Sequence, residues 1–210
     1  MASPGTGAQV RQTAQILAAA FQQDRFTARQ KIWTLSPKFY FSDEQGNTLA
    51  FLRKKVFTLK DEIRVFTDET QSMELLHIKA RKIIDWGTAF DVTDSINHQK
   101  VGVIKRQGWK SIIRKEWTMM DANEQQIGTI KEDSLLLATL RRYVINIIPQ
   151  AYTFEAGGRE LGTARQNWNF FLPKMSVDFS NDPGRQLDRR LVAAAVVLLM
   201  AVEGRQESYD

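Results

Sequence analysis

The stretch that decides the fold is "LDRRLVAAAVVLLMAVEGRQ", Leu187–Gln206. Between Leu191 and Val202 it contains no polar side chain. As an α-helix this apolar run would be about 18 Å long, whereas the hydrocarbon core of a bilayer is about 30 Å thick. Charged residues close the run on both sides: Arg189, Arg190, Glu203 and Arg205. Because a helix that is apolar on every face has to be surrounded by other groups, we expect this one inside a protein core and not across a membrane.

The composition is that of a globular chain, with 210 residues, 43% hydrophobic and 25% charged. Cysteine is absent and the N-terminal sequence lacks the pattern of a signal peptide, so we expect a cytoplasmic protein without disulfides. We predict an N-terminal tail over residues 1–25 that contains a short amphipathic helix at about residues 9–23, one domain over 26–206 and a second tail over 207–210. The net charge of +5 favours anionic partners, such as phospholipid surfaces or nucleic acid.

The chain between these tails repeats a unit of a basic or polar start, a strand, a turn and a second strand. Six units begin at intervals of 24, 26, 26, 26 and 34 residues, at Arg29, Arg53, Lys79, Lys105, Lys131 and Arg165. In each unit two apolar residues flank one central residue, as in Phe39/Phe41 and Trp117/Met119, which predicts a strand with one buried face. Glycine recurs in three of the return strands, where packed backbone comes close: Gly102, Gly128 and Gly162.

The fifth interval is longer than the others, and "LLLATLRRYV" (Leu135–Val144) predicts a helix within it, with Ser134 as its N-cap. The six units give about twelve antiparallel strands, too many for an open flat sheet, and closure removes both sheet edges. A barrel of this size is too wide for its own wall side chains to fill, but a helix about 10 Å across would fill it. We therefore predict a mainly β fold, a closed antiparallel β-barrel of about twelve strands around the helix Leu191–Val202.

Four segments carry a resemblance to a known family: "ARQKIWTLSPKFYFSDEQGN", "VGVIKRQGWKSIIRKEWTMMDANEQQIGTIKEDS", "NWNFFLPKMSVDF" and "LDRRLVAAAVVLLMAVEGRQ". Through them the chain resembles the Tubby C-terminal-like superfamily, and within it the LURP-one-related and phospholipid-scramblase-like branch. The resemblance covers about residues 26–206. It implies a twelve-stranded β-barrel around a hydrophobic C-terminal helix, in agreement with the fold inferred from the repeat.

The resemblance implies binding more than catalysis. Tubby-like members bind phosphoinositide headgroups through basic barrel residues, and scramblase members are linked to calcium-dependent lipid movement. The calcium segment of the family precedes the last helix, where this chain offers Asp178, Ser180 and Asp182 as calcium ligands. Pro183 stands where such a loop favours glycine, and Arg189 where it favours a closing glutamate. A turn that leads into the helix is the alternative interpretation, and no other cofactor is expected.

The sequence gives little support to an enzyme. It contains no G-x-S-x-G, Walker A or H-E-x-x-H motif. Of its two histidines, His77 falls in a predicted strand and His98 in a predicted turn. "AGGRELG" (Ala156–Gly162) has the wrong spacing for a dinucleotide site and predicts a hairpin. We therefore expect a binding module.

The segment "KRQGWKSIIRK" (Lys105–Lys115) is the best candidate for a lipid-headgroup site. Cations beside a tryptophan are typical of side chains at a membrane interface. The candidate residues are Lys105, Arg106, Trp109, Lys110, Arg114 and Lys115. Side chains alternate along a strand, however, so half of any strand portion would point away from a given surface. Three alternatives stay open: a solvated barrel end, a scramblase-like protein that moves lipids, and a barrel that binds nucleic acid or another protein.

Overall fold

The computed structural model describes residues 21–31, 38–53, 62–81, 88–107, 116–133, 150–167 and 173–202. They form twelve strands and the helix α3 (Arg189–Val202). The strands are β1 (Arg25–Lys31), β2 (Lys38–Ser42), β3 (Thr48–Arg53), β4 (Glu62–Phe66), β5 (Glu74–Ala80), β6 (Ala89–Asp94), β7 (Gln99–Arg106), β8 (Glu116–Met120), β9 (Gln126–Glu132), β10 (Ala151–Ala156), β11 (Arg159–Gln166) and β12 (Lys174–Asp178). The predicted helices over residues 9–23 and Leu135–Val144 lie almost wholly outside the described residues.

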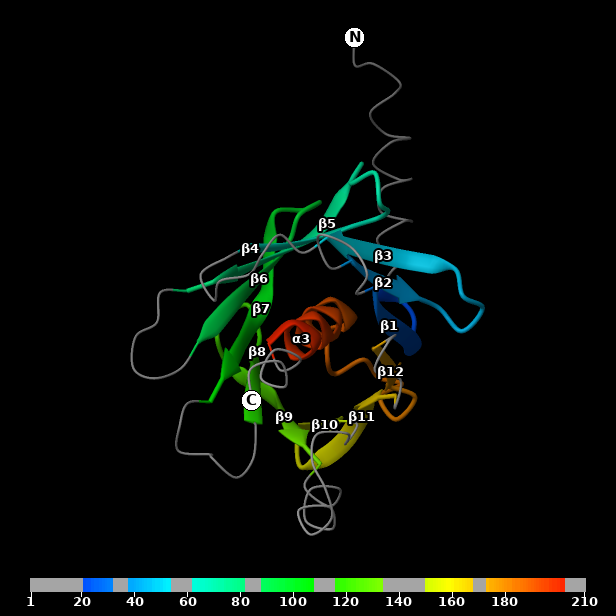
Figure 1. Cartoon of the computed structure of the whole chain (residues 1–210). Coiled ribbons are helices and arrows are strands. Elements are labelled where there is room, and N and C mark those ends of the chain that lie inside the picture. The colour runs from blue at the N-terminus through cyan, green and yellow to red at the C-terminus, as the bar shows by residue number, and fades with distance from the viewer. Residues whose placement is uncertain are drawn as a thin grey trace, which may run out of the picture.

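The strands close into one antiparallel barrel in which each strand pairs with its neighbours in sequence. Figure 1 shows them as a ring around α3. The predicted inward pairs are all buried: Phe39/Phe41, Ile63/Val65, Phe90/Val92, Trp117/Met119, Tyr152/Phe154 and Met175/Val177. The closed barrel inferred from the repeat is thus confirmed.

The prediction was wrong about the sixth unit. It contributes one strand, β12, after which the chain turns and enters α3. The twelfth place belongs to β1, which begins four residues before the first unit and pairs with both β12 and β2. Its pairing with β12, from Arg25 opposite Asp178 to Arg29 opposite Lys174, closes the ring. The first and last strands of the domain therefore lie side by side.

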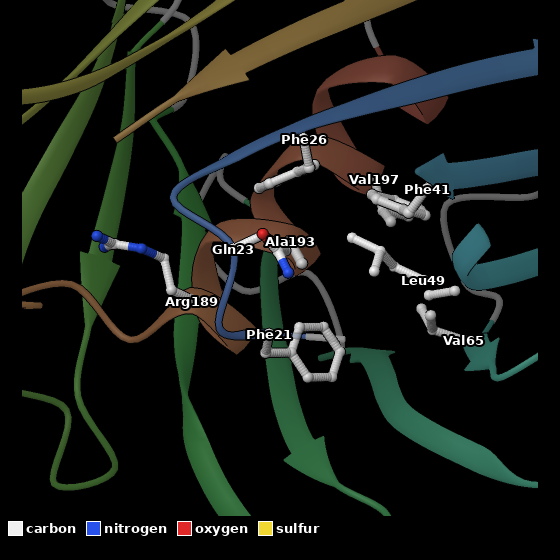
Figure 2. A pocket seen from close by; sticks show the side chains of 10 residues that line it. Phe21, Gln23, Phe26, Phe41, Leu49, Val65, Arg189, Ala193 and Val197 are labelled. Carbon is white, nitrogen blue, oxygen red and sulfur yellow. The ribbon is translucent and has the colours of Figure 1, made fainter. Parts of the chain in front are cut away.

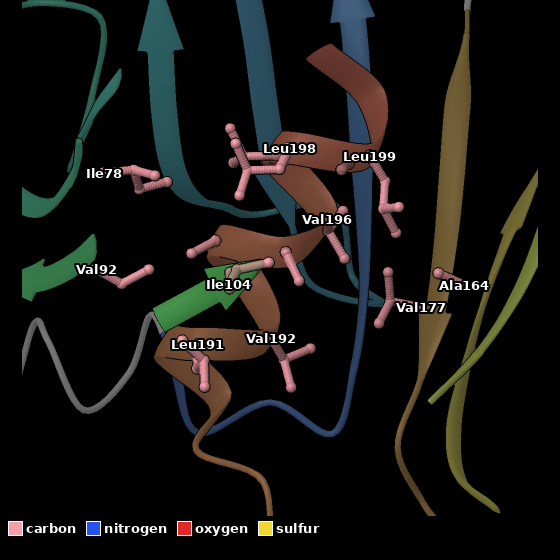
Figure 3. Packing of buried hydrophobic residues seen from close by; sticks show 14 of the residues in the cluster. Ile78, Val92, Ile104, Ala164, Val177, Leu191, Val192, Val196, Leu198 and Leu199 are labelled. Atoms are coloured by element: carbon pink, nitrogen blue, oxygen red, sulfur yellow. The ribbon is translucent and has the colours of Figure 1, made fainter. Parts of the chain in front are cut away.

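Helix α3 fills the barrel, as predicted. Every residue from Leu191 to Leu199 is buried, and Leu198 is 1% exposed. Figure 3 shows Leu191, Val196 and Leu199 between strands from both sides of the ring. Each fully buried Leu or Val side chain contributes about 1.5–3 kcal/mol to folding, so this helix is a major source of stability. It begins at a cap, because the Asp188 carboxylate accepts a 2.9 Å hydrogen bond from the backbone N–H of Arg190.

Two of the glycines expected at close approaches explain how the helix fits. A β-carbon at Gly128 on β9 would lie 2.7 Å from the carbonyl oxygen of Glu155 and 3.2 Å from Cδ2 of Leu187. At Gly162 on β11 it would lie 2.6 Å from Cγ of Phe179. Glycine leaves room at both sites for the segment that carries the chain into the barrel.

Candidate functional site

The two ends of the barrel differ, and their geometry follows from the strand order. We call the end where the odd-numbered strands finish the link rim, with strand ends Lys31, Arg53, Ala80, Arg106, Glu132 and Gln166. The opposite end is the turn rim, with strand ends Ser42, Phe66, Asp94, Met120, Ala156 and Asp178. The predicted units start with a cation, and each start lies near the end of an odd-numbered strand, so the topology brings all six starts to the link rim.

Carboxylates organise the turn rim. In four of the five hairpin turns there, an aspartate accepts hydrogen bonds from backbone N–H groups of its own turn: Asp43, Asp68, Asp94 and Asp121. Hydrogen bonds from Thr70, Ser72 and Thr67 hold the pKa of Asp68 far below its usual value. The fifth turn uses Gly157 and Gly158, both at positive φ (56° and 75°), as the predicted hairpin requires. These acids therefore serve the fold.

A buried ion pair fixes the start of α3 at the turn rim. Asp182 is 0% exposed, and its carboxylate accepts a 2.8 Å hydrogen bond from Arg189 Nη1. Burial raises the pKa of Asp182, but hydrogen bonds from Arg189 and from the backbone N–H groups of Gln186 and Leu187 lower it overall. Arg189 Nη2 also donates to Asp24, 2.8 Å away, which precedes β1. The guanidinium of Arg189 thus links α3 to the segment before β1 and to the segment after β12.

The three calcium candidates belong to this same region. Asp178 accepts hydrogen bonds from the backbone and hydroxyl of Ser180 and a 3.0 Å hydrogen bond from Arg25 Nε. Asp182 is engaged by Arg189, so the two carboxylates have different cationic partners. Among the described residues no group of three or more His, Asp or Glu side chains could hold a metal ion. The arrangement matches the alternative interpretation, a turn leading into the helix, and calcium binding stays an untested prediction.

The predicted headgroup site is only partly visible. Trp109, Lys110, Arg114 and Lys115 lie outside the described residues. Lys105 is exposed near the link-rim end of β7, opposite Ala89 and Thr118. Arg106 points to the other side of the strand, with its guanidinium 5.9 Å from the ring centre of the buried Trp117. The strand alternation therefore separates these two candidates, as the sequence indicated.

A second group of link-rim cations lies on the outer faces of five consecutive strands; the sequence identified Arg29, Arg53 and Arg165 as unit starts that could gather at one barrel end, but not the group as a whole. We call this group the basic sector; it comprises Arg165 on β11, Lys174 on β12, Arg29 and Lys31 on β1, Lys38 on β2, and Arg53 on β3. Its members come from both ends of the chain. The pairing of β1 with β12 unites them, and no local sequence signal reveals that pairing.

A cavity lined by described residues offers little room for a small ligand. It lies between α3 and the wall of β1 to β4, and its volume is about 10 Å³, which is room for about one water molecule. Figure 2 shows apolar side chains around it, with Gln23 and Arg189 as the polar groups. Ligand pockets usually measure about 300–1,000 Å³, so a site for a small molecule is not formed here.

The comparisons with known proteins give one match. A family model described as LURP-one-related matches residues 80–195, more than half of the chain, from the end of β5 into α3. Comparison with curated proteins and with solved structures finds no significant match. Within the described part of the chain, no helix has the length and hydropathy needed to cross a membrane.

Proposed function

We propose that this chain, which belongs to the LURP-one-related family of the Tubby-like C-terminal superfamily, is a non-enzymatic module that binds anionic phospholipid surfaces peripherally. The observation that carries the proposal is the gathering at the link rim of exposed unit-start cations that have no ion-pair partner among the described residues: Arg29, Arg53, Lys105 and Arg165. Each cation near an anionic leaflet contributes about 1 kcal/mol, so several on one end of a barrel give useful affinity without any specific pocket.

The charge of the link rim faces outward. Lys105 is exposed and makes no ion pair with any described carboxylate. Arg53, at the end of β3, has the same properties. The turn rim has a structural role instead, because its aspartates form hydrogen bonds within the turns and at the start of α3. The barrel therefore has one end that suits an anionic surface.

The positions of tryptophan in the sequence support the same proposal, in which the link rim meets the lipid surface. Four of the five tryptophans lie outside the described residues, and in the sequence each follows the end of an odd-numbered strand: Trp33, Trp86, Trp109 and Trp168. Tryptophan is favoured at the membrane–water interface, where its ring is apolar and its N–H is hydrated. The proposal retains Trp109 as a shallow anchor beside Lys110.

Vesicle co-sedimentation tests the proposal. We expect the full chain to bind phosphatidylcholine vesicles that contain phosphatidylserine, and not vesicles of phosphatidylcholine alone. Binding should fall steeply between low and physiological ionic strength, because salt screens exposed charges beyond about 10 Å. Binding that ignores acidic lipid would contradict the proposal.

The double variant Lys105→Glu, Lys110→Glu addresses the predicted cluster itself. We expect it to abolish vesicle binding while the melting temperature stays nearly unchanged, since Lys105 is exposed and without an ion-pair partner among the described residues. Unchanged binding by this variant would return the Lys105–Lys115 cluster to the alternative of a solvated barrel end.

A further inference from the structure

We propose that the basic sector is a second contact surface for the anionic bilayer, beside the Lys105–Lys115 cluster. The inference rests on the proposed function for the identity of the ligand. It assigns a surface on the β11–β12–β1–β2–β3 wall, which Figure 1 shows as one continuous side of the barrel.

The strand register places like charges directly opposite one another in this sector. Arg29 faces Lys174 across β1 and β12. Lys38 faces Lys31 on one side and Arg53 on the other. Like charges in such positions are destabilising. Lys38 is compensated by Glu69, but the pair of Arg29 and Lys174 has no described carboxylate beside it and is therefore a cost that the fold itself does not require.

Little negative charge compensates the sector. Within the described ranges, Glu69 forms an ion pair of 2.5 Å with Lys38. Four members have no ion-pair partner among the described residues: Arg29, Arg53, Arg165 and Lys174. All four are exposed, so their charge is available to a ligand.

Cations on the opposite wall are placed differently. Lys79 on β5 lies 3.3 Å from Glu62, and Lys131 on β9 lies 2.6 Å from Glu155. Arg81 binds Asp91 and Glu124 at 2.6 and 2.7 Å. Those cations are neutralised by their neighbours on the same wall, whereas Arg29, Arg53, Arg165 and Lys174 in the sector have no ion-pair partner among the described residues.

The position of the sector suits a flat anionic surface. Each of its six side chains lies within two residues of the link-rim end of its strand. Directly opposed residues in antiparallel strands have Cα atoms about 4.5–5.5 Å apart, so the two cations of a pair can share one phosphate group. A lipid surface that meets the link rim at this edge would supply several such phosphates together.

A single-stranded nucleic acid fits the sector less well, because it needs aromatic rings on which bases stack. The described aromatic side chain at the centre of the sector is Tyr40, and both its ring and its hydroxyl are used. Arg29 lies 5.8 Å from its ring centre, and Phe51 packs edge-on against it at 5.3 Å. Its hydroxyl donates a 2.6 Å hydrogen bond to Glu69. Burial and that hydrogen bond raise the pKa of Tyr40 to about 12.

The test compares two double variants of the full chain with the same change in net charge. Arg29→Gln with Lys174→Gln removes an opposed pair from the sector, whereas Lys79→Gln with Lys131→Gln removes two ion-paired cations near the same rim. Binding to phosphatidylserine-containing vesicles is measured by co-sedimentation. At about fivefold per cation, we expect the first variant to bind about 25-fold more weakly and the second to change less than about threefold.

Thermal unfolding separates binding from folding. The sector variant should melt at the same temperature as the natural chain or slightly higher, since a repulsion is removed. Equal loss of binding in both variants would show that only net charge matters and would overturn the inference, while the proposed function stands. A wild-type chain that does not bind these vesicles at all would overturn both. If the sector variant lost binding to a single-stranded DNA oligonucleotide while its vesicle binding stayed unchanged, the ligand of the sector would be nucleic acid and not the bilayer.

Discussion

The two ends of the barrel use charge for different purposes. At the turn rim the aspartates have partners within the fold, such as the turn N–H groups that bind Asp121 and the guanidinium that binds Asp182. At the link rim, cations such as Arg29 and Lys174 face one another without a described carboxylate between them. The difference teaches that charges of the same protein can be sorted by their partners: paired acids build the structure, and unpaired cations remain for a ligand.

The largest expected effect comes from a charge introduced into the barrel interior, away from the charged groups of both rims. Leu198 is 1% exposed in the middle of α3, where a carboxylate has no partner and no water. Leu198→Asp should therefore prevent folding, whereas Leu198→Met should cost less than about 1.5 kcal/mol. Urea denaturation of both variants measures this. A soluble Leu198→Asp protein that melts cooperatively would refute the helix-filled barrel.

A smaller effect is expected when the turn rim loses its buried ion pair. Asp182→Ala leaves Arg189, with a side chain 3% exposed, without its buried partner, and should lower the free energy of unfolding by about 3–5 kcal/mol. Asp178→Ala is the matched control, because that carboxylate is exposed and its ion pair with Arg25 is worth at most about 1 kcal/mol. Equal losses from the two variants would show that the contrast between buried and exposed acids is unfounded.

Acid should weaken the protein more gradually. Hydrogen bonds from Arg81 lower the pKa of Asp91, and those from Arg189 help to lower the pKa of Asp182. A carboxyl group whose pKa is lower when folded stabilises the fold fully above its unfolded pKa, about 3.9, and loses that contribution as pH falls through the folded pKa. We expect urea midpoints to be constant down to about pH 5 and to fall below about pH 4. If stability rose on acidification, the ionised carboxylates of Asp91 and Asp182 would destabilise the fold, contrary to this expectation.

The sequence allowed much of the core to be predicted, because alternation and the apolar helix depend on local composition. Phe39, Phe41 and Met175 were assigned to the interior from spacing alone, and they are buried. The closing strand β1 was not predicted: Phe26 and Ala28 flank Thr27 in the same alternating pattern, but they lie before Arg29, where the first unit of the repeat begins.

The basic sector could be predicted only in part, because Arg29, Arg53 and Arg165 are unit starts, whereas Lys174 is not. The pairing of Arg29 with Lys174 arises from the register between β1 and β12, which are far apart in sequence. Lys105 was identified because its neighbours in sequence are also basic. A cluster that forms only in space leaves no such signal.

The central claim is that the link rim, and not the turn rim, meets an anionic surface. Amide hydrogen exchange of the full chain, with and without phosphatidylserine-containing vesicles, tests this most directly. We predict slower exchange on binding in peptides that cover the link-rim ends of β1, β2 and β12, around Lys31, Lys38 and Lys174. The turn at Asp43–Asn47 should exchange at the same rate in both conditions. Protection of that turn, or equal protection of both ends, would contradict the account.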